Sequence, residues 1–136
     1  MEYVSTRGGI EPSTFEEAIL GGFAPDGGLY VPSRIPQLSR TELELMGNLS
    51  YAGLAEKILR PYIPQAQIPD GDLQELIRKS FFNFATEEIT PLVPLEKEGV
   101  IIQELFHGPT QSFKDIVMGF LINCMDYFLA RKKEKL

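Results

Sequence analysis

Lys114 is the residue of this sequence whose type and position are best suited to covalent chemistry. It directly follows Phe113 and lies two residues before Ile116, close to the predicted start of a helix. A helix N terminus carries a positive partial charge, which disfavours an ammonium group there, and apolar neighbours remove water from the amine. Both effects favour a neutral amine that can attack a carbonyl carbon and form a Schiff base.

The neighbouring Asp115 works in the opposite direction, because a carboxylate stabilises a nearby ammonium group. The residues alone therefore leave two interpretations of Lys114 open. In one it is a nucleophile, and in the other it is an ordinary lysine that points to solvent from the start of a helix.

The elements around Lys114 are predicted from a change of hydrophobic period. The continuous β-branched run over residues 100–102 is typical of a strand buried on both faces. A Gly-Pro turn follows, and apolar residues then recur at helical spacing as far as Phe128. Ser112 is predicted to cap this helix, with Asp115 as the reciprocal member of a capping box. Lys114 is therefore expected in the first helical turn.

A second set of candidate residues lies near the beginning of the chain. Ser5, Thr6 and Arg7 are suited to bind an anion, because hydroxyl and guanidinium groups donate hydrogen bonds to oxyanions. Equally, they are suited to cap and solvate the end of a strand. Asp26 belongs to a Pro-Asp-Gly-Gly sequence, which is more typical of a tight turn than of a phosphate cradle.

The region between these two sets is predicted to be helical. Ser13 with Glu16 indicates the start of a first helix. Residues 38–84 are predicted to form helices with apolar core faces, beginning at Ser39 and Ser50. Two apolar segments, residues 89–95 and 100–105, are then expected to pair as a β-hairpin through the polar residues 96–99.

Composition excludes several classes of protein. The chain has 136 residues, of which 43% are hydrophobic and 24% charged, as in a globular domain. A net charge of −6 argues against binding nucleic acid or an anionic membrane surface. One cysteine and one histidine do not suffice for a structural metal site. The first residues contain no apolar segment typical of a secretory signal, so we expect a cytoplasmic location.

Several separated blocks of sequence resemble threonine synthases, which are pyridoxal-phosphate enzymes. Residues 104–115 read Glu-Leu-Phe-His-Gly-Pro-Thr-x-x-Phe-Lys-Asp and resemble the cofactor-lysine motif of that family. Residues 3–8, 15–20 and 24–32 resemble its amino-terminal domain in order and spacing. The resemblance implies an α/β fold, with an α-rich amino-terminal domain over residues 1–88. Residues 89–136 would then form the opening strands and helix of a pyridoxal-phosphate domain.

The same resemblance implies roles for individual residues. Lys114 is the implied Schiff-base lysine that holds pyridoxal 5′-phosphate, with Phe113 beside the cofactor. Gly108 and Thr110 shape the turn that aims this lysine. His107 either hydrogen-bonds the substrate or orients the turn, and a purely structural hydrogen bond is the alternative.

In the family, the loop that contains Asp26 lies near the active site, which adds it to the candidates with Thr6 and Arg7. The implied reaction converts O-phospho-L-homoserine and water to L-threonine and phosphate. The freed lysine would move protons at the substrate carbons.

A glycine-rich phosphate loop follows the lysine helix in threonine synthases, and residues 1–136 contain none. We therefore expect an amino-terminal part of a longer enzyme that is inactive alone and self-associates through its uncovered apolar helix face. Two alternatives stay open: a phospholyase acting on a related phospho-amino acid, and a non-catalytic interaction module.

Overall fold

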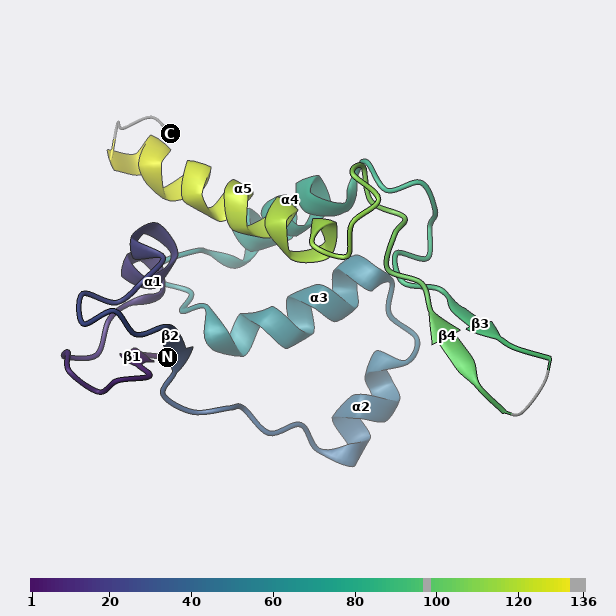
Figure 1. Cartoon of the computed structure of the whole chain (residues 1–136), viewed down its shortest axis with the longest axis horizontal. Helices are drawn as coiled ribbons and strands as arrows, with labels where there is room; N and C mark the ends of the chain where they lie inside the picture. Colours follow the sequence, from purple (N-terminus) through teal and green to yellow (C-terminus); the bar gives the residue numbers. More distant parts are fainter. Residues whose placement is uncertain (97–98, 133–136) are drawn as a thin grey trace.

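The computed structural model describes residues 1–96 and 99–132 and has a mixed α/β fold. In chain order its elements are β1 (Tyr3–Ser5), α1 (Phe15–Gly21), β2 (Tyr30–Pro32), α2 (Arg40–Met46), α3 (Tyr51–Leu59), a 3₁₀ turn (Arg60–Tyr62), α4 (Asp70–Phe81), β3 (Leu92–Pro94), β4 (Ile101–Gln103) and α5 (Asp115–Lys132). Helices α3, α4 and α5 lie together in the middle of the molecule, with one pair of strands near each end (Figure 1). The predicted α/β class is confirmed.

The hydrophobic core lies between α4 and α5 and extends to the N-terminal segment. Cys124 and Phe128 of α5 are almost fully buried with Leu73 and Ile77 of α4. The ring of Phe128 packs edge-on against Phe15 of α1 at a centroid distance of 6.1 Å. Burial of each large apolar side chain contributes about 1.5–3 kcal/mol, so α5 is a principal source of the stability of this chain.

Helical caps account for most of the helix starts. Ser39 forms the predicted capping box with Glu42, and Ser50 caps α3 as expected. The predicted start of α1 is wrong by one residue, because Thr14 is its cap. The backbone of Ser13 is instead paired with Tyr3, through hydrogen bonds of 2.7 and 2.8 Å. Strand pairing therefore holds Ser13 in an extended conformation, and the helix begins after Thr14.

Strands β1 and β2 pair antiparallel beside α1. The tight turn predicted around Asp26 is confirmed, because Gly27 has a φ of +77° and its N–H donates to the carbonyl of Ala24. A left-handed backbone of this kind favours glycine. This turn brings residues 26–29 back against the end of β1.

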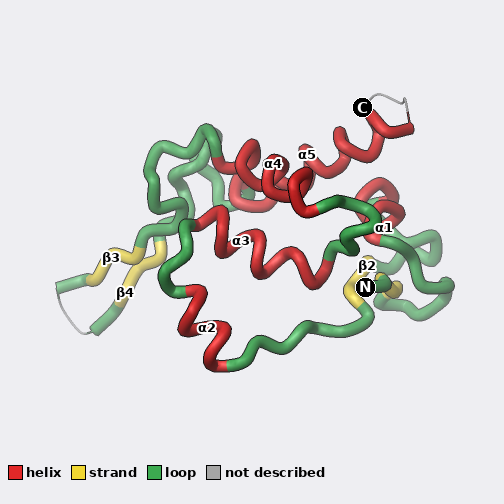
Figure 2. Tube along the Cα trace, turned by 180° about the vertical axis from the view of Figure 1, so that it is seen from behind, coloured by secondary structure: helices red, strands yellow, loops and turns green. Residues whose placement is uncertain are grey.

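Strands β3 and β4 form the predicted antiparallel hairpin, which extends away from the helices in both views (Figures 1 and 2). Residues 97–98 of the predicted connection lie outside the described part of the chain. The expectation of a strand buried on both faces is wrong for these residues, since Ile101 is 61% exposed. The described residues supply β4 with one partner strand, β3, and leave its faces uncovered.

The proposed division into residues 1–88 and 89–136 stays a prediction. Helix α5, assigned to the second part, packs on α4 of the first part. Asn123 of α5 donates to the hydroxyl of Ser80, which donates in turn to the carbonyl of Leu76. None of the described helices is long and apolar enough to cross a membrane.

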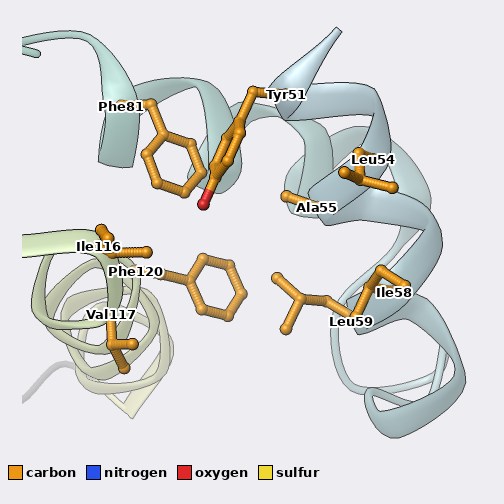
Figure 3. Close-up of a pocket in the computed structure, with 9 residues that line it drawn as sticks. All are labelled: Tyr51, Leu54, Ala55, Ile58, Leu59, Phe81, Ile116, Val117 and Phe120. Carbon is orange, nitrogen blue, oxygen red and sulfur yellow. The ribbon is translucent and has the colours of Figure 1, made fainter. Parts of the chain in front are cut away.

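An apolar groove opens between α3, the end of α4 and the first turns of α5. Figure 3 shows Phe120 pointing from α5 toward Leu59 of α3, and Phe81 and Tyr51 lie above this pair in the view. The groove has a volume of about 290 Å³. Its lining residues are Tyr51, Leu54, Ala55, Ile58, Leu59, Phe81, Ile116, Val117 and Phe120.

Candidate functional site

Lys114 lies immediately before α5. The prediction that it lies in the first helical turn is wrong. Its carbonyl accepts hydrogen bonds from the N–H groups of Val117 and Met118, which makes it the residue that precedes the helix. The turn before it is tighter than an α-helix, because Asp115 N–H donates to the carbonyl three residues back. This tight turn takes up the residues expected to form the first helical turn.

The side chain of Lys114 is exposed and available. Within residues 1–96 and 99–132, its ammonium group has no hydrogen bond or ion pair. The flanking residues do not enclose it, since Phe113 is 63% exposed and Val117 is 64% exposed. The amine is therefore accessible to a ligand that approaches the N terminus of α5.

Asp115 holds the turn in front of Lys114. Its carboxylate accepts a 2.6 Å hydrogen bond from the hydroxyl of Thr110 and a 2.8 Å hydrogen bond from the N–H of the same residue. The Thr110 hydroxyl, with nearby backbone amides, holds the pKa of Asp115 below its usual value. The carboxylate of Asp115 is thus a fixed structural acceptor.

The predicted capping box of Ser112 and Asp115 is only half formed. The amide of Ser112 is among the groups that lower the pKa of Asp115. In return, however, the hydroxyl of Ser112 accepts from the N–H of Lys114, at 3.3 Å. The missing half is the bond from the Asp115 N–H to that hydroxyl, because this N–H donates instead to the carbonyl of Ser112, at 3.0 Å.

Gly108 lies directly against Asp115, at the closest approach within the lysine turn. A Cβ added at Gly108 would lie 2.4 Å from the Asp115 Cβ, far inside normal contact. The residue is buried. Only glycine therefore fits between residues 107 and 109 without displacing the start of α5.

His107 is paired with Glu104 in the same loop. His107 Nε2 lies 2.7 Å from Glu104 Oε2, and the two side chains are 16% and 26% exposed. The carbonyl of His107 accepts from the N–H of Ala85, at 2.9 Å, so the loop is also fixed to the segment after α4.

Thr6, Arg7 and Asp26 form a separate cluster at the β1–β2 corner. Asp26 accepts from the hydroxyl of Ser5 at 2.7 Å, and this bond is the main reason that its pKa is lowered. The guanidinium of Arg7 donates to the Asp26 carbonyl, and the Thr6 hydroxyl accepts from Leu29 N–H. These contacts hold the corner together.

Within this chain, the two clusters lie at opposite ends of α5. Phe15 and Glu16 of α1 contact Phe128 and Lys132 in the last turns of α5, whereas Lys114 precedes the first turn. The helix has 18 residues, which corresponds to about 27 Å. The β1–β2 corner and the lysine loop are also at opposite ends in Figures 1 and 2.

Ser5, a candidate anion donor from the sequence, is 6% exposed and binds Asp26. One polar residue of these clusters, Glu104, was not singled out from the sequence. Glu104 binds His107, and its spacing of three residues from the histidine was an available signal. The described residues contain no group of histidine, cysteine, aspartate and glutamate side chains that could hold a metal ion.

Comparison with known proteins decides the family. Residues 2–81 match the family described as threonine synthase N terminus. The chain belongs to the threonine synthase family. The family inferred from the lysine motif and the N-terminal blocks is thereby confirmed.

Individual members of the threonine synthase family match almost the whole chain. Threonine synthase of Schizosaccharomyces pombe is 44% identical over 132 residues, covering 97% of this chain and 26% of the relative. Threonine synthase-like 2 of Xenopus laevis is 40% identical over 134 residues, covering 98% of this chain and 28% of the relative. The pyridoxal-phosphate-bound threonine synthase of Brucella melitensis is 38% identical with a TM-score of 0.93, covering 99% of this chain and 29% of that structure. The chain thus spans little more than a quarter of the length of these relatives.

Proposed function

We propose that Lys114 is the cofactor-binding lysine of a pyridoxal-phosphate-dependent threonine synthase. The enzyme converts O-phospho-L-homoserine and water to L-threonine and phosphate, and works in the cytoplasm. One observation carries the proposal: Lys114 is an exposed lysine without a partner among the described residues, and it ends a fixed turn. The similarity to a pyridoxal-phosphate-bound enzyme supports it.

The residues at the start of α5 fit such a cofactor. An accessible primary amine is the group that binds an aldehyde, and the amine of Lys114 is accessible. Phe113, beside it, offers an exposed apolar ring to a flat aromatic ligand. When bound, pyridoxal phosphate supplies an electron sink for charge on the substrate carbons.

The chain's own contribution to the reaction is positioning and proton transfer. Asp115 and Thr110 fix the turn, and Gly108 allows it to approach α5. The Nζ of Lys114 removes and returns protons at the substrate carbons as a general acid–base. Thr6, Arg7 and Asp26 are proposed to shape the active site of the complete enzyme, with anion binding by Thr6 and Arg7.

A labelling experiment on the complete enzyme tests the assignment of Lys114. Borohydride reduction in the presence of pyridoxal phosphate, followed by peptide mapping, should place the label on Lys114. Lys114→Ala should remove the label and lower turnover at least about 100-fold. Lys57→Ala, which changes an exposed lysine on α3, is the matched control and should leave both unchanged. A label on another lysine, or full activity of Lys114→Ala, would overturn the proposal.

A phospholyase acting on a related phospho-amino acid is the second candidate. The 40% identity to a threonine synthase-like 2 protein supports this candidate, because the chain matches both threonine synthases and threonine synthase-like proteins. Analysis of the organic product separates the two activities: the synthase yields threonine, and the phospholyase yields a 2-oxo acid. A third candidate, a non-catalytic module, requires that neither product form and that another protein bind.

The apolar surface also supports self-association of the chain in isolation. Val117, Met118 and Ile122 are exposed on α5, next to the groove between α3 and α5. A contiguous apolar surface of this kind is typical of an interface. A second copy of the chain is the proposed partner under those conditions.

A further inference from the structure

Glu104 and His107 form a pair in the lysine loop, and Glu104 has no role in the chemistry described so far. Nε2 of the imidazole is 2.7 Å from Oε2 of the carboxylate. Both side chains are mostly buried, with exposures of 16% and 26%. An ionised carboxylate can only accept hydrogen bonds. The proton of this bond therefore belongs to Nε2 of His107.

The backbone fixes both members of the pair. The N–H of Glu104 donates to the carbonyl of Pro91 at 2.9 Å, which ties it to the β3–β4 hairpin. The carbonyl of His107 accepts from Ala85 at the same distance, which ties it to the segment after α4. The Phe106 ring lies against the imidazole, at a centroid distance of 4.7 Å. The backbone is thus tied at both residues, and the imidazole ring itself is held between the Glu104 carboxylate and the Phe106 ring.

The fixed imidazole is close to Lys114 in space. Gly108 follows His107 directly and touches Asp115, which follows Lys114 directly. These two neighbouring residues place the Cα atoms of His107 and Lys114 within roughly 13 Å of each other. Side chains of this length can reach the same small ligand from that separation.

The second ring nitrogen, Nδ1, is available to such a ligand. It has no hydrogen-bond partner in the part of the chain that the structure describes. Among those residues no fully buried side-chain nitrogen or oxygen lacks a partner, so Nδ1 is in contact with solvent. With the proton on Nε2, Nδ1 carries a lone pair and accepts hydrogen bonds.

We propose that Glu104 is a positioning residue that fixes the Nε2–H tautomer of His107, so that Nδ1 accepts a hydrogen bond from an N–H or O–H group of the bound amino-acid substrate. This inference rests on the proposed function of Lys114. It extends that function, because it adds a substrate-binding nitrogen and the carboxylate that controls it.

The proton position is tested first in the unaltered 136-residue chain. Two-dimensional NMR that correlates the ring carbon protons with both imidazole nitrogens reports which nitrogen of the neutral ring is protonated. The expected result is protonation at Nε2 and a free Nδ1. Protonation at Nδ1 overturns the proposal without any variant, whatever the outcome for Lys114.

Variants of the complete enzyme test the consequence for catalysis. Glu104→Leu removes the acceptor, whereas Glu104→Gln retains a carbonyl oxygen that can still accept from Nε2–H. We expect Glu104→Leu to lose the single tautomer and to lower kcat/KM about tenfold or more, with Glu104→Gln close to the unaltered enzyme. Glu44→Leu, at a surface carboxylate paired with Arg40 on α2, is the matched control.

The outcomes separate the two proposals. If Lys114 is labelled but Glu104→Leu keeps both the tautomer and kcat/KM, the role of Glu104 is wrong and the proposed function stands. If Glu104→Leu and Glu104→Gln lose activity equally while both keep their melting temperature, tautomer control is also wrong. If Lys114 is not labelled, the proposed function fails, and the role of Glu104 in that function fails with it.

Discussion

Replacing Gly108 by alanine should displace the lysine turn without unfolding the protein. The added Cβ would lie 2.4 Å from the Asp115 Cβ and the same distance from the nearer carboxylate oxygen. Ordinary contacts between such atoms begin near 3.4 Å. The turn and the start of α5 must therefore separate by about 1 Å, a shift of the size that costs about 1–3 kcal/mol in a packed site.

The free energy of unfolding measures this cost. Urea titration of Gly108→Ala should show a free energy of unfolding that is lower by about 1–3 kcal/mol. NMR should show changed amide resonances for Thr110 and Asp115. In the complete enzyme, labelling of Lys114 by pyridoxal phosphate and borohydride should slow, because the amine is no longer held in place.

Gly71→Ala is the matched control for the same chemical change. Nothing lies within 4 Å of the position that its Cβ would occupy in the first turn of α4. Alanine there should raise the free energy of unfolding by up to about 1 kcal/mol, because glycine is a poor helix former. If Gly108→Ala is as stable as the unaltered chain and shifts neither amide resonance, the proposed tight contact is wrong.

Two further predictions concern acid stability and assembly. The Ser5 hydroxyl, with the Gly28 amide, lowers the pKa of Asp26 in the folded state. Ionised Asp26 therefore stabilises the fold at pH values above the ordinary aspartate pKa. This stabilisation is lost as the pH falls through the lower pKa of the folded state. Urea unfolding across acidic pH should therefore show a flatter pH dependence in Asp26→Asn, and an identical slope in both proteins would contradict this assignment. In sedimentation velocity over a concentration series, the isolated chain should form reversible oligomers that Val117→Lys weakens. A monomer at every concentration would count against self-association.

The helical part of the fold was predictable because its signals are local. Ser39 and Glu42, or Ser50 before an apolar face, act within a few residues and need no distant partner. The start of α1 was missed because a distant contact decided it. Pairing with Tyr3 holds Ser13 in an extended conformation, and this pairing is not visible in the spacing of residues near the helix.

The sequence supplied the candidate residues of the site, whose roles stay predictions, but not their arrangement. The run around Lys114 indicated the lysine, the turn and the helix after it. The sequence did not reveal that Thr110 binds both oxygens of Asp115. It also did not reveal that α5 begins at Asp115, two residues later than a cap at Ser112 implies. The spacing of three residues between Glu104 and His107 was compatible with a pair, but it did not predict one, because a glutamate at the end of a strand has many available partners.

The position of Phe128 in the core has a consequence for synthesis of the protein on the ribosome. Tyr3 packs on Phe15, and Phe15 packs on Phe128, so the first aromatic residues find their partner more than a hundred residues later. At the usual rate of about 5–20 residues per second, that partner is made on the order of 6–25 s after Tyr3. During this interval the emerging segment exposes aromatic side chains that the folded chain buries. Until Phe128 is made, the N-terminal segment therefore depends on chaperones to cover these side chains.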